Sequence, residues 1–180
     1  MTARDTLGNP LEDVVVWAMP KAAAPLRTRP AAVEQRNKTF IPLVSVVQTG
    51  TLVHFPNRDE IRHHVYSFSP AKRFEIKLYA GTPVDPIAFD KPGEVVLGCN
   101  IHDHMIAYIY VVDSPWFAKT DKDGNARIDG LPAGDYDLNG WHYAQDKSSA
   151  SIPVGLRADD ARSAAFSIGR RPMRPGPVAK

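Results

Sequence analysis

An all-β fold is the architecture that this sequence predicts, and three observations lead to it. Sixteen prolines and twelve glycines are spread along the 180 residues, which suits many short strands joined by turns. Six short runs rich in β-branched and aromatic residues follow one another within about eighty residues. No segment shows a convincing helical pattern longer than a few turns. We therefore expect the chain to be built from β-sandwiches.

The six runs of the central segment are separated by Gly, Pro, Asn and Asp residues, as strands joined by turns are. Residues 74–79 also alternate between apolar and polar side chains, which is typical of a half-buried strand. The predicted strands are residues 40–47, 51–55, 64–68, 74–79, 93–97 and 106–112.

Strand signals also flank this central segment. They fall on residues 14–18, 117–119, 126–130, 134–142, 149–154 and 163–168. Residues 21–32 are small, basic and interrupted by Pro25 and Pro30, so we expect a linker there. Residues 170–180 are basic and lack any fold-forming pattern, which predicts a flexible tail.

The composition limits the classes of function. A formal net charge of +2 is too small to favour nucleic acid as a partner. No apolar stretch approaches the length of a membrane span. The first residues lack the apolar core of a signal peptide, so we expect either a cytoplasmic chain or one whose signal has been removed. The single cysteine excludes an internal disulfide and directs attention to its neighbours.

The segment around that cysteine carries the strongest chemical signal. Cys99, His102 and Met105 supply a thiolate, an imidazole and a thioether within seven residues, between two predicted strands. Two histidines, one cysteine and a weak methionine form the blue-copper arrangement. The second histidine must come from elsewhere, and either His63 or His64 at the head of an earlier strand can supply it. Zinc is the chemical alternative, although zinc sites seldom include a thioether.

Three features of the central segment resemble the cupredoxin family of blue copper proteins, which includes amicyanin and plastocyanin. Residues 99–105 are similar to the C-x2-H-x2-M ligand loop of amicyanin. Residues 57–65 resemble the N-x5-H-x-V stretch that carries the first copper histidine, and this alignment selects His63. Residues 89–99 match the F-x3-G-x5-C approach to the ligand loop.

The chain departs from the family pattern at three positions. Arg62 stands where proline is usual, His64 stands where asparagine is usual, and His104 adds an imidazole inside the loop. We expect His64 and His104 to be neighbours of the site or surface residues rather than ligands.

The resemblance implies a cupredoxin Greek-key β-sandwich over residues 33–113. One copper ion would be held there by His63, Cys99, His102 and Met105. It further implies a type 1 copper protein that carries single electrons between redox partner proteins in the periplasm and is not an enzyme. The alternative is a non-redox copper-binding module, such as a sensor, a buffer or a structural site.

The segments on either side resemble a second kind of β module. Residues 5–16 and 117–141 are similar to the opening and closing parts of carboxypeptidase-regulatory-like and transthyretin-like sandwiches. We therefore expect a small Ig/transthyretin-like sandwich formed by residues 1–20 with 114–169 and interrupted by the copper domain, since insertion at loop tips is tolerated. The whole chain also resembles bacterial proteins described as methylamine-utilisation proteins.

No catalytic set accompanies the metal-binding residues. The sequence lacks a Ser-His-Asp order in nucleophile context, an HExxH motif and a phosphate-binding glycine loop. The run from Asp121 to Asn125 differs from a calcium loop because its glycine falls at the fourth position, so a hairpin turn is predicted. By the resemblance, His102 is the electron port, and Ile61, Ile101 and Phe89 are expected to form an apolar docking patch around it.

Overall fold

The computed structural model describes residues 1–23, 25–83, 85–147, 151–158 and 160–171. Within these ranges the chain forms strands, turns and loops, and none of it is helical. The predicted all-β fold class is therefore confirmed. In the same part of the chain there is accordingly no helix that could cross a membrane.

The chain divides into two compact units, which are described separately. One unit is Ala22–Pro115, and the other combines Met1–Lys21 with the chain from Trp116 onward. It remains a prediction that residues 33–113 form a cupredoxin domain and that residues 1–20 with 114–169 form an Ig/transthyretin-like sandwich.

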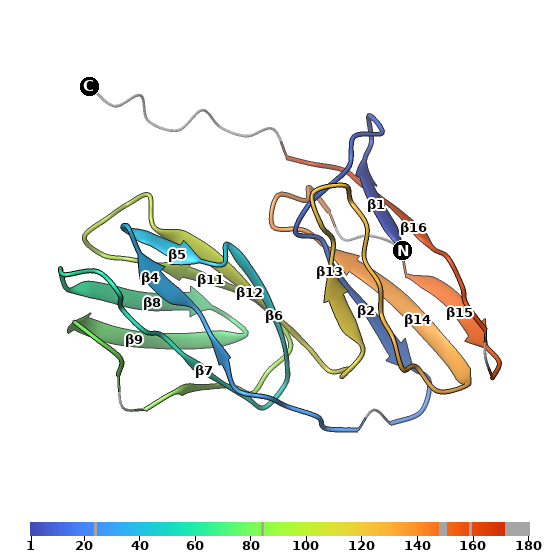
Figure 1. Ribbon diagram of the computed structural model, residues 1–180, viewed down its shortest axis with the longest axis horizontal. Helices are drawn as coiled ribbons and strands as arrows, with labels where there is room; N and C mark the ends of the chain where they lie inside the picture. The colour runs from blue at the N-terminus through green and yellow to red at the C-terminus, as the bar shows by residue number, and fades with distance from the viewer. Residues whose placement is uncertain (24, 84, 148–150, 159, 172–180) are drawn as a thin grey trace. The chain divides into compact units, whose positions relative to one another are not determined.

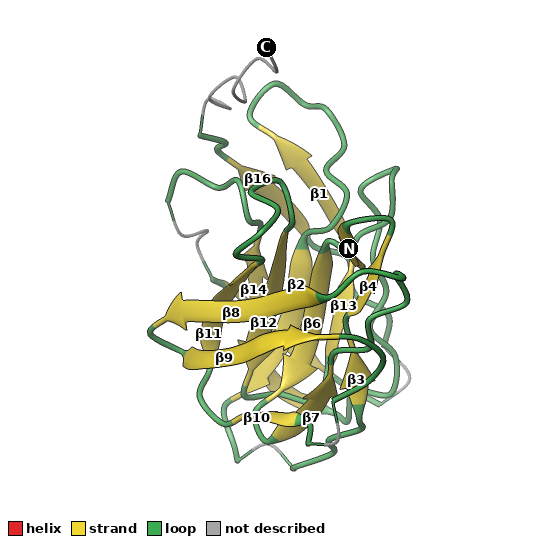
Figure 2. Cartoon of the chain, turned by 90° about the vertical axis from the view of Figure 1, so that its left-hand side faces the viewer, coloured by secondary structure: helices red, strands yellow, loops and turns green. Residues whose placement is uncertain are grey.

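The unit Ala22–Pro115 contains two sheets and a short hairpin (Figures 1 and 2). The larger sheet has the order β6-β12-β11-β8-β9, formed by Val44–Gln48, Ile106–Val112, Gly93–Gly98, His63–Ser69 and Lys72–Tyr79. The smaller sheet has the order β10-β7-β3, formed by Ile87–Phe89, Thr51–His54 and Ala31–Ala32. The hairpin pairs β4 (Glu34–Arg36) with β5 (Thr39–Ile41). β6 runs parallel to β12, whereas β8 is antiparallel to both β9 and β11.

Side chains from both sheets form one core in this unit. Val95 and Leu97 from β11, Ala107 and Ile109 from β12, and Val53 from β7 are all completely buried. Alternate residues of a strand point to one face, which is why these positions are two residues apart within each strand. Each buried valine or leucine side chain contributes roughly 1.5–3 kcal/mol to the free energy of folding.

Two sequence-based expectations for this unit are wrong in detail. The predicted strand at residues 40–47 is divided, because β5 ends at Ile41 and β6 begins at Val44. Pro42 lies between them and has no amide hydrogen to donate to a sheet. The last two residues of the predicted linker form β3, which pairs in parallel with β7.

The second unit is organised around a four-stranded sheet with the order β13-β2-β14-β15. These strands are Phe117–Lys119, Val15–Pro20, Gly134–Trp141 and Ile152–Leu156. β1 (Thr2–Asp5) pairs in parallel with β16 (Ala165–Ile168). Its core contains the buried side chains of Val14, Val16, Trp116, Tyr136, Leu138, Phe166 and Ile168.

The run from Asp121 to Asn125 forms a turn, but the predicted hairpin is wrong, because residues 126–130 form no strand that could pair with β13. A carboxylate oxygen of Asp121 accepts two backbone amides of the turn. Gly124 has a φ of 76°, and a Cβ there would lie 2.4 Å from the carbonyl oxygen of Ala3, so only glycine fits. The chain then bridges from Asn125 to Thr2 instead of folding back on β13.

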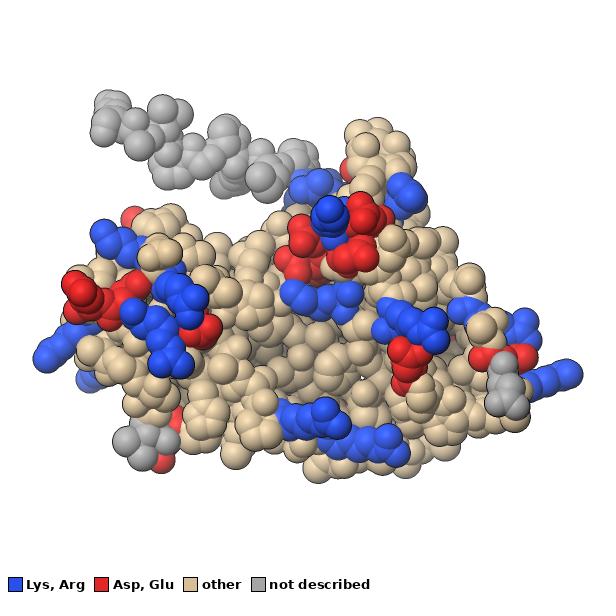
Figure 3. Space-filling view, in the orientation of Figure 1, with Lys and Arg blue, Asp and Glu red and all other residues tan. Residues whose placement is uncertain are grey.

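Charged side chains of both signs are interspersed on the face shown in Figure 3, in keeping with the small net charge. The predicted flexible tail falls mainly outside the described residues. At its start, Arg170 bridges to Gln145, and the amide of Arg171 donates to the carbonyl oxygen of Ala144 at 2.8 Å.

The second unit contains a buried histidine that makes its stability depend on pH. His142 is 3% exposed, and burial, followed by the nearby charge of Arg170, lowers its pKa from 6.5 to about 4. A pKa that is lower in the folded state means that the unfolded chain binds the proton more tightly. The resulting stability is therefore present above pH 6.5 and is lost as the pH falls toward 4.

We expect the free energy of unfolding of this unit to fall by up to about 3 kcal/mol between pH 7 and pH 4 because of His142. The measurement is urea unfolding followed by tryptophan fluorescence, since Trp17, Trp116 and Trp141 all belong to this unit. His142→Phe should flatten this part of the pH profile, and His54→Phe in the other unit should not. Parallel profiles for the parent chain and His142→Phe would contradict the prediction.

Candidate metal centre

The strand pairing of the larger sheet determines which residues meet at the site. β8 and β12 flank β11 and run antiparallel to it, so Gly98 at the end of β11 lies opposite both Tyr66 and Ile106. Cys99 directly follows β11, and His63 is the first residue of β8. The antiparallel register therefore brings His63 next to Cys99, although the two are 36 residues apart in sequence.

Three of the four predicted ligand residues come together as a donor cluster (His63, Cys99 and His102). The Sγ of Cys99 lies 4.0 Å from Nδ1 of His63 and 3.9 Å from Nδ1 of His102. All three donor atoms lie within 4.8 Å of one another. His63 and Cys99 are buried, whereas His102 is partly exposed. Within the described residues this is the one group of His, Cys, Asp and Glu side chains with such spacing.

The fourth predicted ligand, Met105, ends the loop that carries Cys99 and His102. It is 2% exposed, and its amide donates to the carbonyl oxygen of His102 at 2.9 Å. Met105 and Cys99 line the same cavity of about 420 Å³. The structure thus places Met105 beside the donor cluster, and its role as a ligand remains a prediction.

The two additional histidines have other partners and lie outside the donor cluster. Nε2 of His64 lies 2.8 Å from the carboxylate of Glu75. Its ring also contacts the ring of Tyr66, with centroids 5.6 Å apart. Nε2 of His104 lies 3.1 Å from the carbonyl oxygen of Lys38. Both histidines are close to the donor cluster in sequence, but their ring nitrogens bind these other partners and are not part of the cluster.

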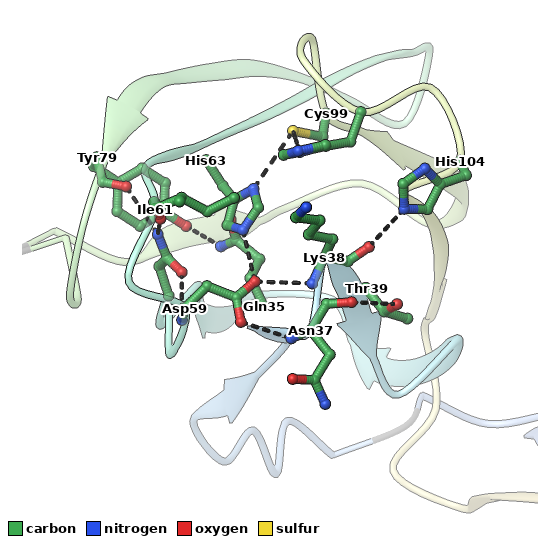
Figure 4. A network of polar contacts seen from close by, with 12 residues as sticks. Gln35, Asn37, Lys38, Thr39, Asp59, Ile61, His63, Tyr79, Cys99 and His104 are labelled. Carbon is green, nitrogen blue, oxygen red and sulfur yellow. Dashed lines mark hydrogen bonds and ion pairs between the residues drawn. The ribbon is translucent and has the colours of Figure 1, made fainter.

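A carboxylate that sequence reasoning missed orients the first histidine. Asp59 Oδ2 lies 2.7 Å from Nε2 of His63, and Figure 4 shows the imidazole between Asp59 and Cys99. A carboxylate only accepts hydrogen bonds, so Nε2 donates to Asp59, and Nδ1 is the ring nitrogen that faces the Cys99 sulfur. The spacing of four residues between Asp59 and His63 is the only signal that could have suggested this pair.

Asp59 is itself held in its charged form. Burial raises its pKa, but hydrogen bonds from the Lys38 amide, the His63 ring and the Asn37 amide outweigh burial, so its pKa lies below the ordinary value of 3.8. The pKa of His102 is also lowered, first by burial and then by the neighbouring His63. Both shifts favour an ionised Asp59 and a neutral His102 imidazole at neutral pH, and a neutral imidazole is the form that binds a metal.

Buried polar groups also support the segment of residues 57–63. The Asn57 side chain donates to the carbonyl oxygens of Ile61 and Tyr79 at 2.8 and 3.0 Å, and it accepts the Asp59 amide at 2.9 Å. The hydroxyl of Tyr79 donates to Phe55 at 2.6 Å, and burial raises the pKa of Tyr79 to about 12. These bonds hold the backbone that leads into His63.

One of the three residues of the predicted docking patch does not lie at the surface, and docking by the other two remains a prediction. Ile61 and Ile101 are exposed, at 42% and 49%. Phe89 is completely buried and packs in the core of the unit. It cannot contribute to a surface, because β10 turns its side chain inward between the sheets.

Among the described residues, the fold and the site together define a β-sandwich protein with a cysteine–histidine cluster at the end of a sheet. No family model matches the chain, and no curated protein matches it. Solved structures similar to about half of the chain are copper proteins and cupredoxins.

The Cu-containing nitrite reductase (NirK) from Thermus scotoductus SA-01 is 28% identical over 52% of this chain, with a TM-score of 0.44. This chain spans only 25% of that enzyme. A purple cupredoxin from Nitrosopumilus maritimus is 18% identical over 46% of this chain and 99% of its own length, with a TM-score of 0.41. A reduced Cu(I) form of an amicyanin mutant is 17% identical, covers 54% of this chain and 98% of its own, and has a TM-score of 0.42.

Asn57→Ala should loosen the segment that positions His63. The change removes three hydrogen bonds of a side chain that is 4% exposed, which costs about 2–3 kcal/mol of stability. Hydrogen exchange of the peptides covering residues 57–63 measures the effect. Asn100→Ala, at an exposed position of the ligand loop, is the matched control. Equal exchange in the two variants would show that Asn57 does not support this segment.

Proposed function

We propose that this chain is a type 1 copper protein that carries single electrons between redox partner proteins. One copper ion would be held by His63, Cys99 and His102, with Met105 as a weak fourth ligand. The observation that carries the proposal is the convergence of three donor atoms within 4.8 Å of one another, two of them on buried side chains. The sequence resemblance to cupredoxins supports an electron carrier rather than an enzyme. It also supports a location in the periplasm.

The donor separations fit one metal ion bound by all three side chains. A metal bound at roughly 2.3 Å to sulfur and 2.1 Å to nitrogen separates these donors by roughly 3.8 Å in a trigonal plane and by roughly 3.6 Å in a tetrahedron. The observed separations of 4.0 and 3.9 Å are slightly longer than both values and are compatible with either geometry. The residue types favour copper, because two histidines, one cysteine and a distant methionine are typical of blue copper, whereas zinc sites seldom include a thioether.

The residues of the site supply what one-electron exchange requires. Bound copper cycles between Cu(I) and Cu(II), and it does so fastest where its surroundings change least. The burial of Cys99 and Met105 excludes water from the sulfur side. The carboxylate of Asp59 fixes the orientation of His63. His102 is the partly exposed member of the donor cluster, and the exposed Ile101 beside it offers an apolar contact to a partner.

Copper titration of the metal-free protein tests the proposal. Stoichiometric Cu(II) should produce an intense thiolate-to-copper absorption band at the red end of the visible spectrum and a narrow hyperfine splitting in the EPR spectrum. Cys99→Ser should abolish the band, because the charge transfer originates on the thiolate. His54→Gln, which changes a histidine of the same unit outside the donor cluster, should retain it. A colourless protein that binds Cu(I), zinc or no metal would refute the proposal.

Voltammetry of the copper-loaded chain distinguishes a carrier from a sensor or buffer. A carrier should cycle reversibly at one potential and keep its copper through many cycles. Release of copper to a chelator within each reductive cycle would instead favour the non-redox copper-binding module.

A further inference from the structure

One hairpin turn contacts both segments that carry the donor cluster. The turn joins β4 to β5 and consists of Asn37 and Lys38, with φ values of 53° and 55°. Two consecutive left-handed residues form the mirror-image turn that suits a two-residue hairpin. Asparagine tolerates this conformation, but lysine has no such tendency. Lys38 therefore needs outside contacts to stay in place.

The amides of the turn bind the segment that carries His63. The Asn37 and Lys38 amides donate to the two carboxylate oxygens of Asp59 at 2.6 and 2.9 Å. The same carboxylate binds Nε2 of His63 at 2.7 Å. Asp59 has a side-chain exposure of 12%, so it is largely withdrawn from water and relies on these three partners.

The carbonyl group of the turn binds the other segment. Nε2 of His104 donates to the carbonyl oxygen of Lys38 at 3.1 Å, as Figure 4 shows. His104 lies two residues after His102, and the two rings are in edge contact with centroids 5.9 Å apart. Lys38 thus bonds to residues 57–63 through its N–H and to residues 99–105 through its C=O.

We infer that Asn37, Lys38 and His104 are positioning residues of the metal centre, which hold its two ligand-bearing segments at the spacing of the donor cluster before metal binds. The inference rests on the proposed function for its purpose, but each of its hydrogen bonds joins two protein groups and uses no metal atom. A preset spacing lowers the reorganisation on metal binding and limits the movement between oxidation states. It also explains why the loop contains His104, an imidazole that the donor cluster does not use.

The first test uses the metal-free full-length chain. Hydrogen exchange at the Met105 amide, which bonds to His102 at 2.9 Å, reports opening of the ligand loop. His104→Ala removes the donor to Lys38 and should speed exchange at least tenfold. His104→Gln, whose amide nitrogen can replace Nε2, should restore most of the protection. Equal exchange in the parent chain, His104→Ala and His104→Gln would overturn the inference, whatever metal the protein binds.

The second test uses the copper-loaded chain. Lys38→Pro removes the amide that binds Asp59 and cannot adopt a positive φ, whereas Lys38→Gly keeps the N–H, the C=O and the conformation. Lys38→Pro and His104→Ala should each raise the rate of copper release about 10- to 100-fold and alter the EPR hyperfine splitting. Lys38→Gly and His104→Gln should stay within about twofold of the parent.

The outcomes separate the two proposals. If the parent chain shows no thiolate-to-copper band, the proposed function fails, and hydrogen exchange alone decides whether the turn positions the loop. If the parent shows the band and His104→Ala leaves copper release and the spectrum unchanged, the positioning inference fails. If Lys38→Pro does not fold, the comparison of His104→Ala with His104→Gln still decides the matter.

Discussion

The pairing of β11 with both of its neighbours is the constraint on which the donor cluster depends. Gly98 lies opposite Tyr66 on one side and Ile106 on the other, so Cys99 emerges where β8 and β12 both begin. A shift of one residue in this register would turn Val95 and Leu97 out of the core. The apolar core therefore enforces the register, and the register places the cysteine beside the first histidine. The geometry of the site is in this sense a consequence of core packing.

A close backbone approach accompanies this register. The ring of Tyr66 lies against Gly98, where a Cβ would come within 2.7 Å of the ring. Any larger residue before Cys99 would therefore displace either the ring or the strand end. The absence of a side chain at this one position lets the strand that leads to the cysteine pack beneath an aromatic residue of its neighbour.

Beside the donor cluster, the largely buried carboxylate of Asp59 has three hydrogen-bond partners that compensate for its loss of water. Asp59 loses much of its hydration, yet each hydrogen bond to a charged acceptor returns about 1.5–3 kcal/mol. Three such bonds hold it ionised. The same network ties a hairpin, a ligand-bearing segment and a ligand loop to one another. The hydrogen bonds of this network join protein groups to one another, so the spacing of the three donor residues is supported by the protein itself.

The two units differ in how much chain each needs in order to fold. The unit with the metal centre uses the continuous stretch Ala22–Pro115. The other unit pairs β1 with β16 and β2 with β14, so its strands come from both ends of the sequence. Because β14 and β16 come late in the sequence, this second unit cannot complete its sheets until those strands have been synthesised. The continuous unit carries no such requirement.

The sequence by itself determined the all-β class and most strands of the Ala22–Pro115 unit, because alternating apolar residues and turn-forming residues act over a few positions. It also singled out Cys99 and His102 by residue type and spacing, whereas His63 was selected over His64 only by the resemblance to cupredoxins. Only the tertiary structure decided that Asp59 and Lys38 support this cluster, that His64 instead binds Glu75, and that Phe89 is buried. It likewise decided that the segment after Asn125 bridges to Thr2. These outcomes depend on partners distant in the chain, and local sequence patterns carry no information about which distant residue will lie opposite.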